Sequence, residues 1–187
     1  MDRALLGKDM KIKLVNFTTK SVKKFLKENS KLTFYAFGYD CNAEYAEVNL
    51  CFNTEEAFEK TLKSYQKGEF AESYQSDEDI EDLKFNTGDW DYQCFDSIYL
   101  LSDQELTKIF NQLPEDNYVS WNEFLQELME IFCEALLEFS QTDVYKSIPK
   151  TEDFRVICID HDEDVSDAQD RLESVKEKVQ NNFTQIK

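Results

Sequence analysis

The sequence has few of the residues on which common enzyme motifs depend. Its 187 residues include only 4 Gly, 2 Pro and 1 His. No Gly-rich nucleotide-binding loop is present, and the GxSxG and HExxH motifs are also missing. With His161 as the single histidine, zinc sites with two or more histidines are excluded, and Ser–His or Cys–His catalysis would have to use that residue. We therefore expect no cofactor and assign no catalytic residue.

Long apolar runs and paired cysteines are missing as well. No segment approaches the roughly 18 apolar residues that a membrane-spanning helix needs, and Met1–Arg3 do not open a signal-peptide pattern. The cysteines are odd in number and never form a CxxC pair, which favours reduced thiols that serve packing. They are Cys41, Cys51, Cys94, Cys133 and Cys158. We expect a cytoplasmic protein that does not bind membranes.

Basic side chains are in the minority. The chain has 39 Asp and Glu against 21 Lys and Arg, which gives a net charge of −18. Nucleic acids are bound by neutralising phosphates with Lys and Arg, so this chain would repel them. The charge is also uneven, because residues 1–31 are net positive and the remainder is strongly negative. The sequence therefore excludes nucleic acid as a partner and favours a basic one.

What the sequence does contain is enough apolar material for a folded core. Hydrophobic residues make up 41% of the chain, with 15 Phe and 9 Tyr, and a chain of this length typically forms one domain. Residues 10–29 have the spacing of an amphipathic helix, and residues 32–39 and 45–52 resemble two strands of a hairpin. Thr54 begins another helix, and residues 85–95 and 154–160 contain further strands.

Three later helices are predicted from capping boxes, in which an N-cap Ser is followed three residues later by Glu or Gln. The pairs are Ser102 with Glu105, Ser120 with Glu123, and Ser166 with Gln169. The predicted order is α-β-β-α-loop-β-α-α-β-α. We expect an α+β fold, a single domain over residues 1–187 with a small, mainly antiparallel sheet flanked by about five helices.

Two acidic segments are candidates for a partner-binding surface. Residues 69–84 have low hydrophobicity and are predicted to form a long acidic surface loop. Its acidic run contains Asp77, Glu78, Asp79, Glu81 and Asp82. The helix that begins at Trp121 has an apolar face for the core, and its other face carries Glu with no Lys or Arg between them. These residues are Glu123, Glu127, Glu130, Glu134 and Glu138.

Like charges at this spacing each cost about 0.2–0.5 kcal/mol. We predict that changing Glu127, Glu130 and Glu134 to Lys, or Asp77, Glu78 and Asp79 to Lys, leaves the fold intact and slightly raises stability.

Two smaller motifs are open to a structural or a functional interpretation. Asp89 and Trp90 after Gly88 could form a recognition surface, but a structural turn with Trp90 in the core is favoured. Asp160, His161 and Asp162 follow a predicted strand and could form a cation site or a His–carboxylate pair. The segment lacks the ligand order of an EF-hand, so a solvated turn is favoured. We expect no metal, and these three residues are the candidates if one binds.

Three short motifs carry a resemblance to a known family. They are FYAF at residues 34–37, NTEEA at residues 53–57 and GDW at residues 88–90. In these motifs the chain resembles bacterial proteins of the domain of unknown function 4303, over most of its length from the first helix to the strand before Asp160. The resemblance implies a compact α/β domain without an established activity, similar to the small proteins found near immunity genes of polymorphic toxins.

Binding of another protein is the leading functional hypothesis. An immunity-type inhibitor could use the acidic surface, with Asp89 and Trp90, to hold a basic toxin, because complementary charge speeds encounter and excludes like-charged competitors. A simpler alternative is that the charge only keeps the protein soluble, with the basic first helix packed against the acidic remainder.

Two further alternatives come from different classes of protein. One is a metal-assisted hydrolase that uses Asp160, His161 and Asp162 with Asp89. The other is a scaffold or regulatory protein that docks through residues 1–29. The apolar stripe of this first helix needs burial, so we expect its residues to belong to the core.

Overall fold

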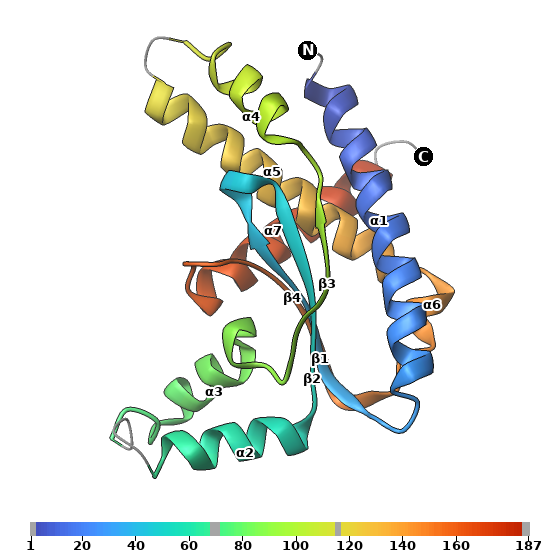
Figure 1. Ribbon diagram of the computed structural model, residues 1–187, viewed down its shortest axis with the longest axis vertical. Coiled ribbons are helices and arrows are strands. Elements are labelled where there is room, and N and C mark those ends of the chain that lie inside the picture. Colours follow the sequence, from blue (N-terminus) through green and yellow to red (C-terminus); the bar gives the residue numbers. More distant parts are fainter. Residues whose placement is uncertain (1–2, 68–71, 115–116, 185–187) are drawn as a thin grey trace.

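The chain folds into an α+β single domain in a computed structural model that describes residues 3–67, 72–114 and 117–184 (Figure 1). Within these ranges there are seven α-helices and a four-stranded mixed sheet. The helices are α1 (Arg3–Glu28), α2 (Glu55–Tyr65), α3 (Asp77–Phe85), α4 (Asp103–Phe110), α5 (Asn117–Phe139), α6 (Asp143–Lys146) and α7 (Val165–Thr184). The strands are β1 (Phe34–Asn42), β2 (Glu47–Asn53), β3 (Tyr92–Tyr99) and β4 (Lys150–Asp160). The α+β class is confirmed.

The sheet has the strand order β3-β2-β1-β4. β1 and β2 form the expected antiparallel hairpin, β3 extends it on the β2 side, and β4 pairs with β1 in parallel. The parallel pairing requires a long crossover, and here the chain between β3 and β4 supplies it with α4, α5 and α6. Every residue of β1 from Phe34 to Cys41 is buried, as expected for a central strand covered on both faces.

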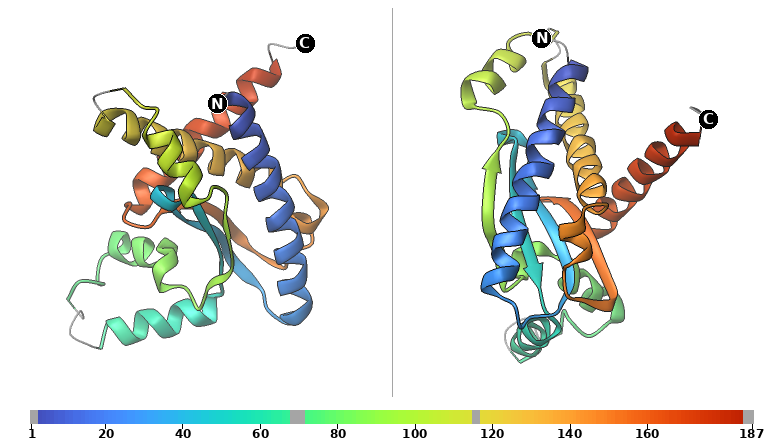
Figure 2. Two further views of the ribbon diagram at one scale, coloured as in Figure 1. Left: turned by 45° about the horizontal axis from the view of Figure 1, so that its top comes forward. Right: turned by 90° about the vertical axis from the view of Figure 1, so that its right-hand side faces the viewer.

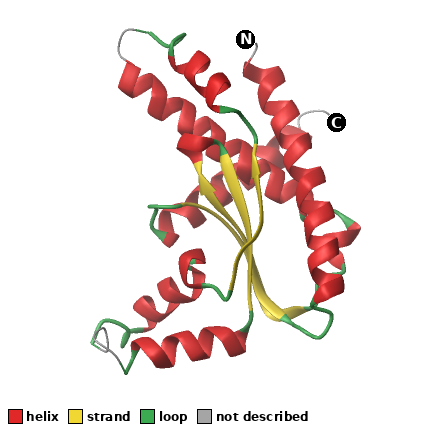
Figure 3. Ribbon diagram, viewed as in Figure 1, coloured by secondary structure: helices red, strands yellow, loops and turns green. Residues whose placement is uncertain are grey.

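Helices cover both faces of the sheet. α1 and α5 pack against each other over one face (Figure 2). Leu14, Val22 and Phe25 of α1 are buried in this layer, which confirms that the apolar stripe of the first helix belongs to the core. On the other face, α2, α3 and the beginning of α7 form a second cluster with Trp90 (Figure 3). Among the described residues, none of the helices combines the length and apolar character that a membrane span requires.

The predicted acidic loop over residues 69–84 is wrong for its second half. Residues 77–85 form α3, and residues 69–71 lie outside the described part of the chain. The Ser76 hydroxyl accepts a hydrogen bond from the backbone N–H of Asp79 at 3.1 Å and so caps the helix. The acidic residues that follow lie in the first turn, where the helix dipole favours negative charge. The acidic run is therefore the start of a helix.

The helix starts show where the capping pattern is reliable. Thr54 and Ser102 are N-caps as predicted, and Ser102 and Glu105 form the complete capping box. The predicted boxes at Ser120 and Ser166 are wrong, because α5 begins at Asn117 and α7 at Val165, so both serines lie inside their helices. A Ser followed by Glu or Gln occurs by chance in a chain rich in polar residues, and only the preceding backbone decides whether it caps.

Candidate functional site

Three of the five Glu residues along α5 are paired with cations from other helices. Arg3 and Lys11 come from α1, and Lys178 comes from α7. The ion pairs are Arg3 Nη1–Glu127 Oε1 at 3.3 Å, Lys11 Nζ–Glu134 Oε2 at 2.9 Å and Lys178 Nζ–Glu130 Oε1 at 2.7 Å. The interpretation of this stripe as uncompensated is therefore wrong. The charge of these three residues is matched within the molecule, which leaves Glu127, Glu130 and Glu134 less suited to a partner than the sequence suggests.

The acidic residues of α3 are in a different situation. Asp77, Glu78, Asp79 and Asp82 are exposed. Of the run, only Glu81 forms an ion pair among the described residues, with Arg155 of β4. The other carboxylates face water.

The beginning of α7 adds a second group of carboxylates on the same side of the sheet. α3 packs against α7, where Leu83 and Phe85 share a buried cluster with Val165 and Ala168 (Figures 1 and 2). We call the exposed carboxylates of these two segments the α3–α7 acidic surface. It consists of Asp77, Glu78, Asp79, Asp82, Asp162, Asp164, Asp167 and Asp170. Folding thus brings together two acidic segments that lie far apart in the chain.

Asp89 and Trp90 form a structural turn and not an exposed recognition surface. Trp90 is buried, and its indole Nε1–H donates to the carbonyl oxygen of Lys84 at 3.0 Å. Asp89 accepts a hydrogen bond from the Tyr65 hydroxyl at 2.6 Å, and this carboxylate raises the pKa of Tyr65 to about 12. Gly38 allows the Trp90 ring to pack closely against the backbone of β1, because a Cβ at this position would lie only 3.1 Å from the ring. The proposed recognition role of Trp90 is therefore wrong.

The segment after β4 does not bring its three candidate residues together. Asp160 Oδ1 accepts hydrogen bonds from the backbone N–H groups of Ala43, at 3.2 Å, and His161, at 3.1 Å. This carboxylate therefore holds the turn. Asp162 is exposed, and His161 instead places its Nδ1 3.7 Å from Asp40 Oδ1. All three residues line a cleft of about 350 Å³. Among the described residues, however, their ligand atoms do not converge closely enough to hold one metal ion.

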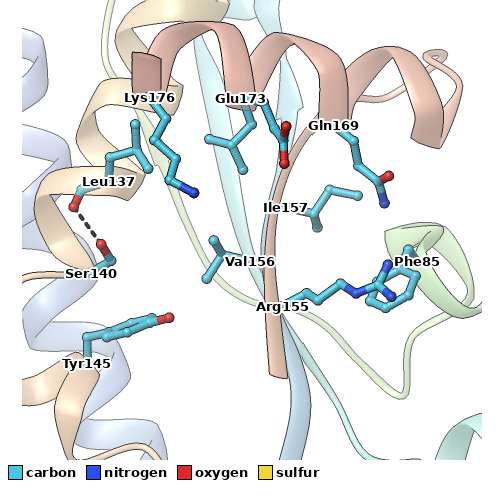
Figure 4. A pocket seen from close by; sticks show the side chains of 11 residues that line it. Phe85, Leu137, Ser140, Tyr145, Arg155, Val156, Ile157, Gln169, Glu173 and Lys176 are labelled. Carbon is cyan, nitrogen blue, oxygen red and sulfur yellow. Dashed lines mark hydrogen bonds between the residues drawn. The ribbon is translucent and has the colours of Figure 1, made fainter. Parts of the chain in front are cut away.

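A groove of about 440 Å³ lies between β4, α5 and α7 (Figure 4). Ser140 in this groove donates its hydroxyl to the carbonyl oxygen of Leu137 at 2.6 Å, so it is not paired with a base. The Arg155 guanidinium lies 4.6 Å above the Phe85 ring and pairs with Glu81. Ser140 and Arg155 are thus engaged in holding the fold.

The residues that sequence reasoning missed are Asp40, Cys51 and Cys94. One ligand atom from each lies within 4.8 Å of the other two. Their positions in the sequence give no signal of this, because they come from three strands and become neighbours only through the strand register. The cysteines were expected to serve packing, and Cys94 is instead exposed.

The family is decided by a comparison of the chain with known sequence families. The chain belongs to the family described as Domain of unknown function (DUF4303). The match covers residues 14–176, from within α1 to within α7. No curated protein and no solved structure matches the chain. The resemblance of the sequence to this family is confirmed, and the function has to be argued from the sites described above.

Proposed function

We propose that the protein is a non-catalytic binding protein that holds a basic protein partner against the α3–α7 acidic surface. Within this class, we propose an immunity-type inhibitor that neutralises a basic toxin. The observation that carries the proposal is the exposure of these carboxylates on two segments that pack against each other. Among the described residues, none of them has a Lys or Arg in an ion pair, whereas the α5 stripe has three such pairs.

The electrostatics of this surface suit a basic partner. Unneutralised carboxylates on one side of a protein with a net charge of −18 create a negative potential in front of that side. Such a potential speeds association with a positively charged surface and repels acidic competitors. The nearby groups do not favour a hydrolase, because Asp160 Oδ1 accepts hydrogen bonds from two backbone N–H groups and Asp89 accepts one from the Tyr65 hydroxyl.

The proposal is tested by co-expressing the protein with each product of the genes that neighbour its own, after screening those products for toxicity to the host. The expected results are restored growth of the host and a saturable complex whose association rate falls as salt is added. The variant Glu78→Lys/Asp82→Lys/Asp170→Lys changes three exposed carboxylates of the α3–α7 acidic surface. We expect it to slow association by about tenfold or more at low salt, because attraction becomes repulsion.

A matched control makes the same change in net charge elsewhere. Glu28→Lys/Glu123→Lys/Glu138→Lys alters exposed residues of α1 and α5 that form no ion pair in the described structure. If both variants associate at the same rate, the α3–α7 acidic surface is not the binding site. If the parent protein neither restores growth nor forms a saturable complex, the function itself is contradicted and the charge serves solubility.

A further inference from the structure

The pairing of β2 with β3 is interrupted at Cys51. Leu50 pairs with Asp96 and Phe52 pairs with Tyr92, so Cys51 alone faces residues 93–95. This is a β-bulge, a feature that re-aims side chains and is enriched next to functional sites. Here the bulge contains Cys94.

Cys94 adopts a backbone conformation that residues other than glycine rarely use. Its φ is 48°, in the left-handed region. Such positions persist when the surroundings enforce them and cluster at functional sites. The conformation directs the Cys94 N–H at Cys51 Sγ, 3.3 Å away.

Asp40 approaches the two cysteines from β1. Its carboxylate is buried and accepts a hydrogen bond from the Thr87 hydroxyl at 3.1 Å. Among the described residues no Lys or Arg forms an ion pair with it, and the His161 ring is its neighbour, with Nδ1 3.7 Å from Asp40 Oδ1. A buried carboxylate is usually paired with a cation or bound to a metal. Asp40 is buried without a Lys or Arg partner among the described residues, so a bound metal ion would supply the missing positive charge.

The spacing of these groups fits a tetrahedral metal site. The ligand atoms of Asp40, Cys51 and Cys94 all lie within 4.8 Å of one another. Zinc binds sulfur at about 2.3 Å and carboxylate oxygen at about 2.0–2.2 Å, which places tetrahedral ligands roughly 3.3–3.8 Å apart. The three ligand atoms therefore need to move only a short distance toward one another to bind the ion. His161 Nδ1 lies 3.7 Å from Asp40 Oδ1, and its exposed ring is free to turn toward the same ion.

We propose that Asp40, Cys51 and Cys94 form a Zn²⁺ site, with His161 as the fourth ligand. Two thiolates with a carboxylate and an imidazole select a borderline-soft divalent ion over Mg²⁺ or Ca²⁺, which prefer oxygen ligands. The ion would give buried Asp40 its missing cation. It would also link β1, β2 and β3 to the segment after β4. The site is separate from the α3–α7 acidic surface and does not depend on the proposed function.

Cobalt(II) is the probe for the first experiment, because it replaces zinc at tetrahedral sites and absorbs light. The full-length protein is stripped with a chelator, kept reduced and titrated with cobalt. We expect saturation at one equivalent, with the charge-transfer band of thiolate ligands and the d–d bands of a tetrahedral ion. Zinc added afterwards should remove both bands by displacing cobalt.

Single substitutions identify the ligands. Cys94 is exposed, so Cys94→Ser should keep the fold. We expect this variant to bind zinc at least about tenfold more weakly and to show a smaller thiolate band with cobalt. Loss of even an outer-shell partner costs about 10- to 100-fold in affinity. Asp40→Asn should weaken zinc binding to a similar extent. His161→Gln should also weaken zinc binding, but the cobalt–thiolate band should remain because both cysteines are still present. Cys133→Ala is the matched control, because it removes a buried thiol from another part of the core.

A second readout does not depend on metal spectra. Zinc should protect Cys94 from alkylation by iodoacetamide, measured by mass spectrometry, because a bound thiolate is not a free nucleophile. The proposal is overturned if the reduced parent protein shows no thiolate–cobalt band. It is also overturned if Cys94→Ser binds zinc as tightly as the parent, or if zinc leaves the alkylation rate of Cys94 unchanged.

Discussion

The α5 stripe and the α3–α7 acidic surface look alike in the sequence, yet their carboxylates have different neighbours. On α5, Glu127 and Glu134 pair with α1, and Glu130 pairs with α7. On the α3–α7 acidic surface, the exposed carboxylates have no such partner among the described residues. Part of the negative charge is thus used inside the molecule to receive the basic first helix, and part is left for solvent or a partner. The charge pattern of a single helix does not tell whether its carboxylates pair with cations of the same molecule or remain exposed to solvent.

The two kinds of contact between α1 and α5 differ in strength. An exposed ion pair contributes about 0.2–1 kcal/mol, and less in high salt. Burial of one large apolar side chain contributes about 1.5–3 kcal/mol. The apolar contacts therefore hold α1 in place, while the ion pairs favour the correct alignment of the two helices.

The largest expected effect tests whether α1 is held by its apolar face. Leu14→Ala removes a fully buried side chain and should lower the free energy of unfolding by about 3 kcal/mol. Ile12→Ala on the exposed face of the same helix, where the residue is 45% exposed, should cost far less. Urea denaturation of both variants measures the difference. Equal effects would mean that α1 does not belong to the core.

The next effect concerns the ion pairs of α5. Glu127→Lys/Glu130→Lys/Glu134→Lys places Lys opposite Arg3, Lys178 and Lys11. We expect a loss of about 1–3 kcal/mol in the free energy of unfolding at low salt, shrinking as salt is added. This reverses the expectation from the sequence, in which the same change raises stability.

The control for that prediction is Glu123→Lys/Glu138→Lys on the same helix, where no ion pair is found in the described structure. It should change stability by no more than about 0.5 kcal/mol. A rise in stability of the triple variant would show that repulsion within the stripe outweighs the pairs with α1 and α7.

A smaller effect is expected where carboxylates act on the dipole of their own helix. Neutralising the first turn of α3 with Asp77→Asn/Glu78→Gln/Asp79→Asn should lower stability by about 0.5–1 kcal/mol, because the helix N-terminus favours negative charge. Asp82→Asn in the last turn should raise stability slightly or leave it unchanged. The melting temperatures of the two variants at low salt provide the comparison. If both variants shift the melting temperature in the same direction, the dipole is not the cause.

The smallest effect is a pH dependence at the capping box of α4. Hydrogen bonds from the Ser102 backbone N–H and hydroxyl lower the pKa of Glu105. A lowered pKa means that the stabilisation is present above the unfolded value of 4.5 and is lost as pH falls through the folded pKa. Glu105→Gln should therefore cost less than about 0.5 kcal/mol at neutral pH, since the carboxylate is exposed. The cost should shrink as the pH falls below 4.5 and vanish where the carboxylate is protonated in the folded protein as well. A cost that persists there would point to lost geometry and not lost charge.

Periodicity and local capping made much of the fold predictable from the sequence. The first helix, the hairpin, the Thr54 and Ser102 caps and the apolar face of α5 all depend on residues close in the chain. α3 was missed because its acidic run has low hydrophobicity, although Ser76 is a good cap. The ion pairs of α5 and the cluster of Asp40, Cys51 and Cys94 could not be predicted, because they depend on which distant segments meet. The bulge at Cys51 is invisible without the strand register.

The parallel pairing of β1 with β4 has a consequence for how the chain folds. Ala36 lies beside Arg155, although the two are separated by most of the chain. Contacts between residues so far apart slow folding, because a long loop must close before they form. During synthesis, the β1–β2 hairpin emerges well before β4, so β1 has one open edge until residues 150–160 have been synthesised. Such an edge invites association between nascent chains, which makes this interval the period of greatest risk of misassembly.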